Sequence, residues 1–391
     1  MPLDYELLSP QRIVFGWGRR RELGELARTL GRRAFVVLGS RTLERNGAWM
    51  ELRQRLSDAQ VTAELLVVQT REPTIVDVDG VTVMLRSHHA GAGDFVLAIG
   101  GGAAIDLAKA AAALATNVHG DSVRDFLEGV GKGLQITTQP LPMLAMPTTG
   151  GTGTEATKNA VISVDSPSVK KSIRSPMMVP RVVLVDPELS VSVPPATTAW
   201  TGMDAITQLI ESYISKNARP IPQALAIHGL TLALPQMRNA VRDGMSRPAR
   251  EAMAHAALLS GMALANSGLG LAHGVAAALG VFADVPHGLA CALMLPAALR
   301  VNRALAEKPL AELARAALSC STGNDAEAAD VLIRAIDSLC ADLNVPTRLH
   351  QVGVKPEQLD DLVSGSRGNS MNGNPRAVSD AELRMILEEM L

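Results

Sequence analysis

The segment FVLAIGGGAAIDLAK, residues 95–109, runs from an apolar stretch through three consecutive glycines into a stretch of helical character. Its apolar part, Phe95 to Ile99, predicts a short buried β-strand. The glycines allow backbone N–H groups to approach a phosphate closely, and the helix start behind them favours an anion. The segment therefore fits a pyrophosphate-binding turn, but the glycines alone fit a tight structural turn equally well.

Further apolar runs continue this pattern through the first half of the chain. Buried strands are predicted at residues 34–38, 144–146 and 182–185, and helices at residues 49–57 and 75–88. Such an alternation of strands and helices predicts a parallel sheet covered on both faces.

The hydrophobic pattern of the sequence changes after Asp186-Pro187, where helical patterns begin and continue nearly to the C-terminus. We therefore expect an α/β domain at residues 1–192 and an all-helical domain at residues 193–391, with the active site between them. Residues 364–374 are rich in Gly, Ser and Asn and predict an extended loop.

A second glycine-rich turn, PTTGGTGTE at residues 147–155, directly follows a predicted strand. Threonine hydroxyls can bond ribose and phosphate oxygens, and the glycines keep the backbone close to a ligand. The alternative is a threonine-rich surface turn. Two such turns at strand ends favour one nucleotide site.

Candidate metal ligands lie in the helical half. A helix over residues 202–211 would place Asp204 and Gln208 one turn apart on the same face. His273 and His287 each lie among apolar and glycine residues. A lone histidine in such a setting is more often a hydrogen-bonded core residue than a ligand, so neither histidine alone indicates a metal.

The motifs taken together resemble the iron-containing (group III) alcohol dehydrogenases. The resemblance rests on GGG-x-x-x-D-x-x-K, PTTGGTGTE, DPEL, GMDAITQ and AHG through PHG in that order, with Phe15-Gly16-x-Gly18 and Gly373-Asn374-Pro375-Arg376 near the ends. It implies a dehydroquinate synthase-like architecture, in which an N-terminal dinucleotide-binding α/β domain precedes an all-α domain. It also implies a divalent ion, Fe²⁺ or Zn²⁺, and a homodimer or larger assembly.

The resemblance also implies the metal ligands, an Asp and three His in the family. The matching residues here are Asp204, Gln208, His273 and His287. Because Gln208 supplies a neutral amide in place of an imidazole, we expect weaker binding of iron or zinc and a shift toward harder ions. Many members carry a second His four residues after the first, where this chain has Ala277, so the proton relay would use water or the cofactor ribose. No side chain is assigned a catalytic role.

Cofactor positions of the family map onto the two glycine-rich turns and their surroundings. They are Gly101, Gly102, Ala103, Asp106, Thr148, Thr149, Thr152, Thr157, Asn159 and Lys170. After the first strand, NAD-preferring members carry an Asp, whereas this chain has Ser40 and Arg41. These two residues would accept a 2′-phosphate, so we expect NADP(H) to be favoured over NAD(H). If Arg41 is only a surface residue, both cofactors bind.

Composition indicates a small-molecule partner. The formal net charge is -2, and the basic residues are scattered, so the sequence contains no basic cluster that would bind nucleic acid or a membrane surface. The apolar stretch at residues 252–281 is interrupted by His255, Asn266 and His273, and the first residues contain no signal segment. A cytoplasmic location is therefore expected.

The chain has three cysteines without metal-ligand spacing, and they are expected to be buried thiols.

The leading hypothesis is metal-assisted, reversible hydride transfer between the nicotinamide and a small alcohol, aldehyde or ketone. A metal-independent reductase resembling maleylacetate reductase is the first alternative, because of Gln208 and Ala277. A nucleotide-binding protein without turnover is the second. A dehydroquinate synthase-like lyase would need a dense basic set in the helical half, which the sequence lacks.

Overall fold

The structure, a computed structural model, describes residues 4–166 and 168–391 and divides them into two compact units. One unit contains residues 8–149 and 154–191, and the other contains residues 4–7, 150–153 and 192–391. The expected boundary near Ser192 is therefore one of several points at which the chain passes from one unit to the other. Both architectures expected from the sequence, α/β and all-helical, are confirmed.

In the described part of the chain, the α/β unit is built on a six-stranded parallel sheet in the order β1-β8-β5-β4-β2-β3. The strands are β1 (Arg12–Phe15), β2 (Arg33–Leu38), β3 (Thr62–Val68), β4 (Asp94–Gly100), β5 (Met143–Pro147) and β8 (Val182–Val185). A separate antiparallel pair is formed by β6 (Asn159–Asp165) and β7 (Ser168–Arg174). The four strands predicted from apolar runs are confirmed, and β1, β3, β6 and β7 were not predicted.

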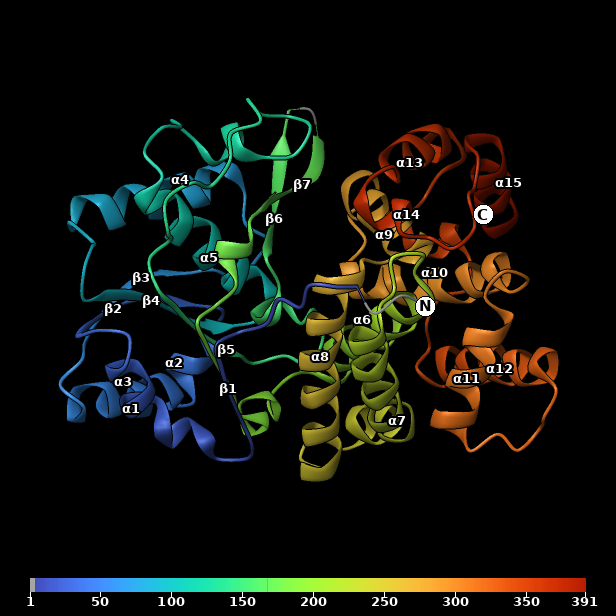
Figure 1. Ribbon diagram of the computed structural model, residues 1–391, viewed down its shortest axis with the longest axis horizontal. Helices are drawn as coiled ribbons and strands as arrows, with labels where there is room; N and C mark the ends of the chain where they lie inside the picture. The colour runs from blue at the N-terminus through green and yellow to red at the C-terminus, as the bar shows by residue number, and fades with distance from the viewer. Residues whose placement is uncertain (1–3, 167) are drawn as a thin grey trace. The chain divides into compact units, whose positions relative to one another are not determined.

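Helices cover both faces of the sheet, as predicted (Figure 1). The helices of this unit are α1 (Leu23–Arg28), α2 (Thr42–Arg45), α3 (Ala48–Asp58), α4 (Ile75–Ser87) and α5 (Gly102–Thr116). Val96 and Ala98 of β4 pack toward α4 and α5. The alternate residues Phe95, Leu97 and Ile99 pack toward α1 and α3. A central strand buried on both faces is why β4 reads as an unbroken apolar run.

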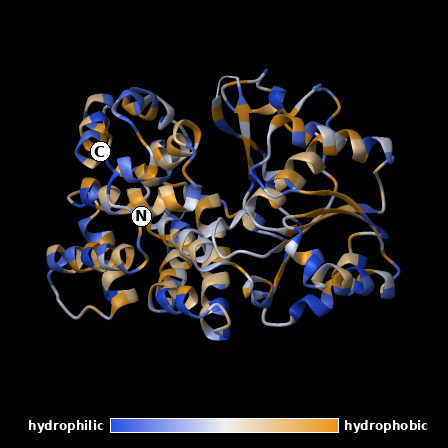
Figure 2. Cartoon of the chain, turned by 180° about the vertical axis from the view of Figure 1, so that it is seen from behind, coloured by the Kyte–Doolittle hydropathy of each residue, from blue (hydrophilic) through white to orange (hydrophobic). Residues whose placement is uncertain are grey.

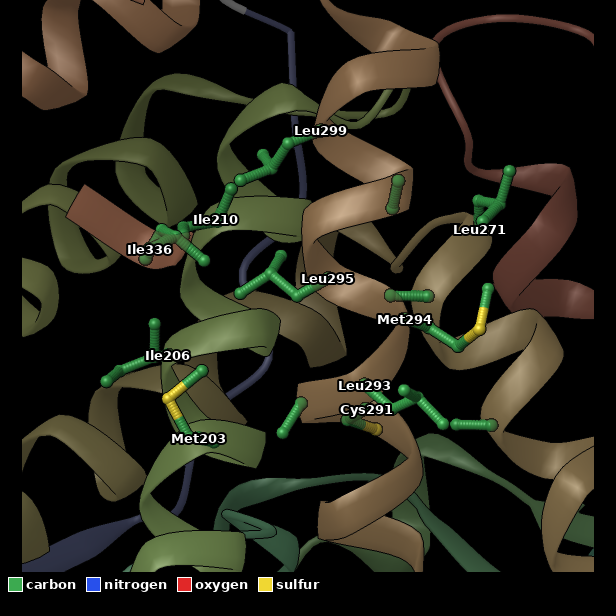
Figure 3. Packing of buried hydrophobic residues seen from close by; sticks show 14 of the residues in the cluster. Met203, Ile206, Ile210, Leu271, Cys291, Leu293, Met294, Leu295, Leu299 and Ile336 are labelled. Atoms are coloured by element: carbon green, nitrogen blue, oxygen red, sulfur yellow. The ribbon is translucent and has the colours of Figure 1, made fainter. Parts of the chain in front are cut away.

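The helical unit consists mainly of long helices whose shared faces are apolar. They are α6 (Pro195–Ile214), α7 (Pro220–Arg242), α8 (Arg247–Ser267), α9 (Leu271–Phe282), α10 (His287–Asn302), α11 (Glu307–Leu318), α12 (Asp325–Asp342), α13 (Leu359–Gly365), α14 (Asn369–Asn372) and α15 (Asp380–Met390). Aliphatic side chains and methionines fill their core (Figure 3). Figure 2 shows the sheet of the α/β unit mostly in the hydrophobic colour and the helices in both colours.

The prediction of an extended loop at residues 364–374 is wrong in part. It includes the last residues of α13 and all of α14, and Asn374 at its end is buried. The Asn374 Oδ1 accepts hydrogen bonds from the backbone N–H of Leu271 at 3.1 Å and from Asn302 Nδ2 at 2.8 Å. The segment therefore fixes the start of α9.

The apolar stretch at residues 252–281 falls mostly on α8 and α9. Among the described residues, no single helix is long and apolar enough to cross a membrane; α8 and α9 reach the necessary length only together, with a bend of 103° between them.

Candidate metal centre and cofactor site

Three side chains of the helical unit converge from three helices. Asp204 lies in the middle of α6, His273 in the first turn of α9, and His287 at the first residue of α10. The His273 Nε2 lies 3.1 Å from Asp204 Oδ1, and the His287 Nε2 lies 4.0 Å from the same oxygen. The Asp204 and His273 side chains are buried, whereas that of His287 is about one-third exposed.

Gln208, the fourth predicted metal ligand, lies beside Asp204 one helical turn further along α6. Its Nε2 donates a hydrogen bond to Asp204 Oδ1 at 3.1 Å, and its Oε1 accepts one from the Ser260 hydroxyl at 2.6 Å. The amide nitrogen thus faces the carboxylate and the oxygen faces α8. Binding of a cation by Gln208 would require the amide to turn over, and its role as a ligand stays a prediction.

Glu211 is a buried acidic residue to which the sequence analysis gave no role. Its Oε2 lies 2.7 Å from His273 Nδ1, and its carboxylate accepts backbone N–H groups of Gly270 at 3.0 Å and Ala272 at 2.7 Å. With a cation bound, a carboxylate at Nδ1 would hold the imidazole proton there and leave the Nε2 lone pair for the metal. The spacing of Asp204, Gln208 and Glu211 along one helix face was the available signal.

Cys291 is a second residue that the sequence analysis missed. Its Sγ lies 3.7 Å from His287 Nε2, one turn further along α10. One ligand atom from each of Asp204, His273, His287 and Cys291 can be chosen so that all lie within 4.8 Å of one another. Cys291 and Cys340 are buried thiols as expected, but Cys320 is only partly buried, so that part of the expectation is wrong.

The charges of this cluster stabilise one another. Burial opposes ionisation of Asp204, but the hydrogen bond from His273 and the nearby imidazoles outweigh it and lower the pKa of the carboxyl. Attraction to the Cys291 side chain is the largest cause that raises the pKa of His287 to about 9. Burial disfavours the His273 imidazolium. Its interactions with Cys291, Asp204 and Glu211 nevertheless raise its pKa well above the usual value. Such shifts are common where several ionisable groups share a functional site.

The donor set fits a divalent cation. Ligand atoms bound to one tetrahedral zinc lie about 3.3–3.6 Å apart, given zinc–ligand bonds of about 2.0–2.3 Å. The separations of 3.1, 3.7 and 4.0 Å in the cluster are close to that spacing. Imidazole nitrogens and a carboxylate are also the ligand types that zinc and ferrous iron share.

In the α/β unit, the loops after β2, β4 and β5 meet at the carboxyl end of the sheet. A Cβ on Gly39 would lie 2.6 Å from the Gly100 Cα, so only glycine allows these two loops to approach so closely. The Thr148 N–H donates to the Gly100 carbonyl at 3.0 Å, and a Cβ on Gly101 would lie 3.3 Å from the Thr149 hydroxyl. The chain reverses its direction across the sheet between the neighbouring strands β2 and β4, where dinucleotides bind in doubly wound folds.

The predicted phosphate-binding residues occupy the start of α5. Gly101 is the residue before the helix, and Gly102 and Ala103 form its first turn, where no side chain caps the backbone N–H groups. Ser40 and Arg41 follow β2, and Arg41 is exposed. The Ser40 hydroxyl accepts the Thr42 N–H at 3.0 Å, which begins α2.

Three other predicted cofactor residues surround a buried lysine, Lys109. Its ammonium donates to the Thr157 hydroxyl at 2.9 Å and to the Asn159 carbonyl at 2.7 Å, and lies 3.9 Å from Asp106. The Asp106 carboxylate accepts from the Thr154 hydroxyl and, at 3.1 Å, from the Val161 N–H. These contacts brace α5 against β6. Nucleotide contacts of Asp106, Thr157 and Asn159 stay a prediction.

The remaining predicted cofactor residues lie further from this network. Lys170 on β7 pairs with Glu72 at 2.5 Å. Thr152 belongs with the helical unit, as do the glycines on either side of it. A Cβ on Gly153, whose φ is +61°, would lie 2.5 Å from the Gly261 Cα on α8. The PTTGGTGTE turn therefore also has a packing role that the sequence analysis did not foresee.

Comparison with known proteins places the chain in one family. The sequence model described as "Iron-containing alcohol dehydrogenase" matches residues 10–187, and that described as "Fe-containing alcohol dehydrogenase family, C-terminal" matches residues 198–391. The chain belongs to the iron-containing alcohol dehydrogenase family. The resemblance found in the motifs is confirmed, and the protein is an oxidoreductase of the alcohol dehydrogenase type.

Individual relatives match this iron-containing alcohol dehydrogenase over nearly its whole length. A 1,3-propanediol dehydrogenase of Citrobacter freundii is 32% identical over 394 residues, with 98% of each chain covered. The solved structure of an alcohol dehydrogenase from Oenococcus oeni has a TM-score of 0.91 at 31% identity and covers 99% of this chain and 100% of its own. A sulfoacetaldehyde reductase from Bifidobacterium kashiwanohense, solved with NAD⁺, has a TM-score of 0.87 at 31% identity and covers 100% of this chain and 99% of its own.

Family membership implies a divalent metal and a nicotinamide cofactor. Ala277, at the position where many members carry a second histidine, lies on α9 one turn after His273 and is partly exposed. Its methyl group carries no exchangeable proton.

Proposed function

We propose that this protein catalyses reversible hydride transfer between NADP(H) and a small alcohol or its aldehyde or ketone, at a metal held by Asp204, His273 and His287. The observation that carries the proposal is the convergence of these three side chains, which come from three different helices and meet within hydrogen-bonding distance or close to it. A cluster of buried ionisable groups in a family of metal-dependent dehydrogenases favours a catalytic role over a structural one.

Each named residue has a distinct task in this proposal. Asp204 and the two imidazoles hold the cation, and Glu211 fixes the proton of His273 on Nδ1. When bound, the metal polarises the carbonyl oxygen of the substrate. The glycine-rich start of α5 binds the cofactor pyrophosphate through backbone N–H groups, as the strand order supports.

The preference for NADP(H) is proposed from the loop after β2. Ser40 and Arg41 provide a hydroxyl and a guanidinium where a carboxylate would repel a 2′-phosphate, and Gly39 brings this loop against Gly100. We expect fluorescence titration to give tighter binding of NADPH than of NADH, and Ser40→Asp to shift the preference toward NADH. Equal or reversed affinities in the unmodified protein would contradict this assignment.

We propose a cytoplasmic homodimer or larger homo-oligomer, and a small-molecule substrate. The family resemblance supports the assembly, and the scattered charge supports a partner other than nucleic acid or a membrane. Short alcohols and carbonyl compounds are the proposed substrates, in line with the printed names of the relatives.

The deciding experiment combines metal analysis of the purified protein with an NADPH oxidation screen over aldehydes, ketones and keto acids. We expect turnover to require a divalent ion and to be lost in His273→Ala and His287→Ala. Full activity after exhaustive chelation, with no loss in His273→Ala, would support the metal-independent reductase instead. Cofactor binding without turnover of any carbonyl compound would support a nucleotide-binding protein.

A further inference from the structure

We propose that Cys291 is a protein ligand of the metal, and that the centre is an Asp204-His273-His287-Cys291 site selective for zinc, with Gln208 outside the coordination sphere. The inference rests on the metal-assisted function proposed above, because it concerns which side chains hold that metal. It replaces the ligand role expected for Gln208 and the expected shift toward harder ions.

The position of Cys291 carries the first step of the argument. His287 and Cys291 occupy successive turns of one face of α10, a spacing at which two side chains can bind one ion. The Sγ of Cys291 lies 3.7 Å from His287 Nε2, and all four ligand atoms lie within 4.8 Å of one another. Small movements of these atoms, outward for the His273–Asp204 pair and inward for the others, would give the spacing of about 3.3–3.6 Å expected around zinc.

Gln208 is committed to other contacts. Its Nε2 donates to the Asp204 oxygen that faces both histidines, and its Oε1 accepts from Ser260. This arrangement holds the Asp204 carboxylate in place, as hydrogen-bonding partners of metal-binding carboxylates do. Gln208 is therefore a positioning residue, and binding through its oxygen would remove a donor from Asp204.

Charge and polarisability favour the sulfur over the amide. A thiolate is a charged, soft ligand, whereas a glutamine oxygen is neutral and hard. One thiolate and one carboxylate together balance the double charge of the cation. Thiolate ligands select zinc over manganese or magnesium, so the site keeps zinc affinity although one histidine of the family pattern is missing.

Cys291 has a matched control in Cys340. Both thiols are buried in the core of the helical unit, and Figure 3 shows Cys291 on α10 among apolar side chains. The Cys340 sulfur lies 3.8 Å from the Ala292 carbonyl and is not in the cluster. Substitution of either cysteine by serine removes one buried sulfur, but only Cys291 lies beside the candidate metal ligands.

The experiment replaces the native metal of the full-length protein with Co²⁺ and records its near-ultraviolet absorption, where thiolate-to-cobalt charge transfer gives a distinctive band. We expect one equivalent of Co²⁺ to give that band in the unmodified protein, in Cys340→Ser and in Gln208→Ala, and the band to be lost in Cys291→Ser. Zinc affinity, measured by chelator competition, should fall by more than about 100-fold in Cys291→Ser, because substitutions that only disturb ligand orientation already cost about 10- to 100-fold.

The outcomes separate the two proposals. Stoichiometric Co²⁺ binding without a thiolate band, or with a band that persists in Cys291→Ser, would overturn the role of Cys291 and leave the metal-assisted function intact. Failure of the unmodified protein to bind Co²⁺ or Zn²⁺ at all would overturn both.

Discussion

Lys109 is among the largest fully buried side chains of the α/β unit, although it carries a charge. Burial lowers the pKa of its ammonium to about 8, so the group is still protonated at neutral pH. Oxygen atoms of Thr154, Thr157 and Asn159 and the carboxylate of Asp106 surround it. Loss of the ammonium would leave a buried carboxylate without its counter-charge.

Replacement of Lys109 by methionine is therefore expected to lower the free energy of unfolding by about 3–5 kcal/mol, the cost of leaving one partner of a buried ion pair alone. Chemical denaturation measures the change. Lys132→Met, which removes a largely exposed ammonium paired with Asp121 and Asp125, should change stability by less than about 1 kcal/mol. Lys109→Met combined with Asp106→Asn should be less destabilised than Lys109→Met alone, and equal losses would refute the pairing.

Glu211 would act on the metal centre through His273, whose Nδ1 lies 2.7 Å from its carboxylate. We predict that Glu211→Gln weakens metal binding by about 10- to 100-fold, because the amide holds the Nδ1 proton of His273 less firmly. Competition with a chelator gives the affinity. Glu251→Gln, at a surface pair with Arg247, is the control and should bind metal normally; a Glu211 variant with unchanged affinity would contradict the assignment.

At the same scale, the sequence indicated some site residues and missed others for a physical reason. Asp204, His273 and His287 stand out because charged or imidazole groups are rare in apolar helices. Cys291 did not, because cysteine is itself a common buried residue, and only its spacing from His287 distinguishes it. Glu211 was hidden because its partners, backbone N–H groups at the start of α9, are distant in sequence.

Among the elements, helix α8 depends on a glycine in its interior. A Cβ on Gly261 would lie 2.0 Å from the Gly153 carbonyl oxygen, which is a backbone atom and cannot rotate away. Gly80 in helix α4 is the matched case, because a Cβ there meets nothing within 4 Å.

We expect opposite effects from the same substitution in these two helices. Gly261→Ala should destabilise the protein by about 1–3 kcal/mol or more, since the two segments must move apart. Gly80→Ala should stabilise it by about 0.5–1 kcal/mol, because alanine loses less conformational entropy in a helix. Thermal and denaturant unfolding compare the variants. A tolerated Gly261→Ala would show that the contact is not required.

The elements that the sequence predicted are those whose environment is uniform. Strands β2, β4, β5 and β8 are buried on both faces and read as apolar runs. Strand β3 lies at the edge of the sheet with several partly exposed residues. Strand β6 alternates buried residues with more exposed ones, and β7 is mostly partly exposed and contains two lysines. β3 pairs with β2, and β6 pairs with β7, but local composition does not reveal either pairing.

For the whole molecule, the proposed cofactor and metal sites draw on different parts of the chain. The loops after β2 and β4 belong to one unit, whereas Asp204, His273 and His287 belong to the other, as does Thr152 of the loop after β5. We therefore predict that removal of the metal by chelation abolishes turnover and changes NADPH affinity by no more than a few-fold. Zinc should restore the activity. A parallel loss of NADPH binding would show that the metal is needed for the cofactor site itself.

Residues 150–153 also affect which chimeras of two family members will fold. These four residues lie within the first half of the sequence but are packed with the helices of the second, where Gly153 meets Gly261. A gene fusion with one crossover near residue 192 would give the helical half of one parent a foreign version of this short segment. Recombination should therefore yield folded chimeras most readily when both parents carry glycine at 153 and 261, or when residues 150–153 are inherited together with the helices.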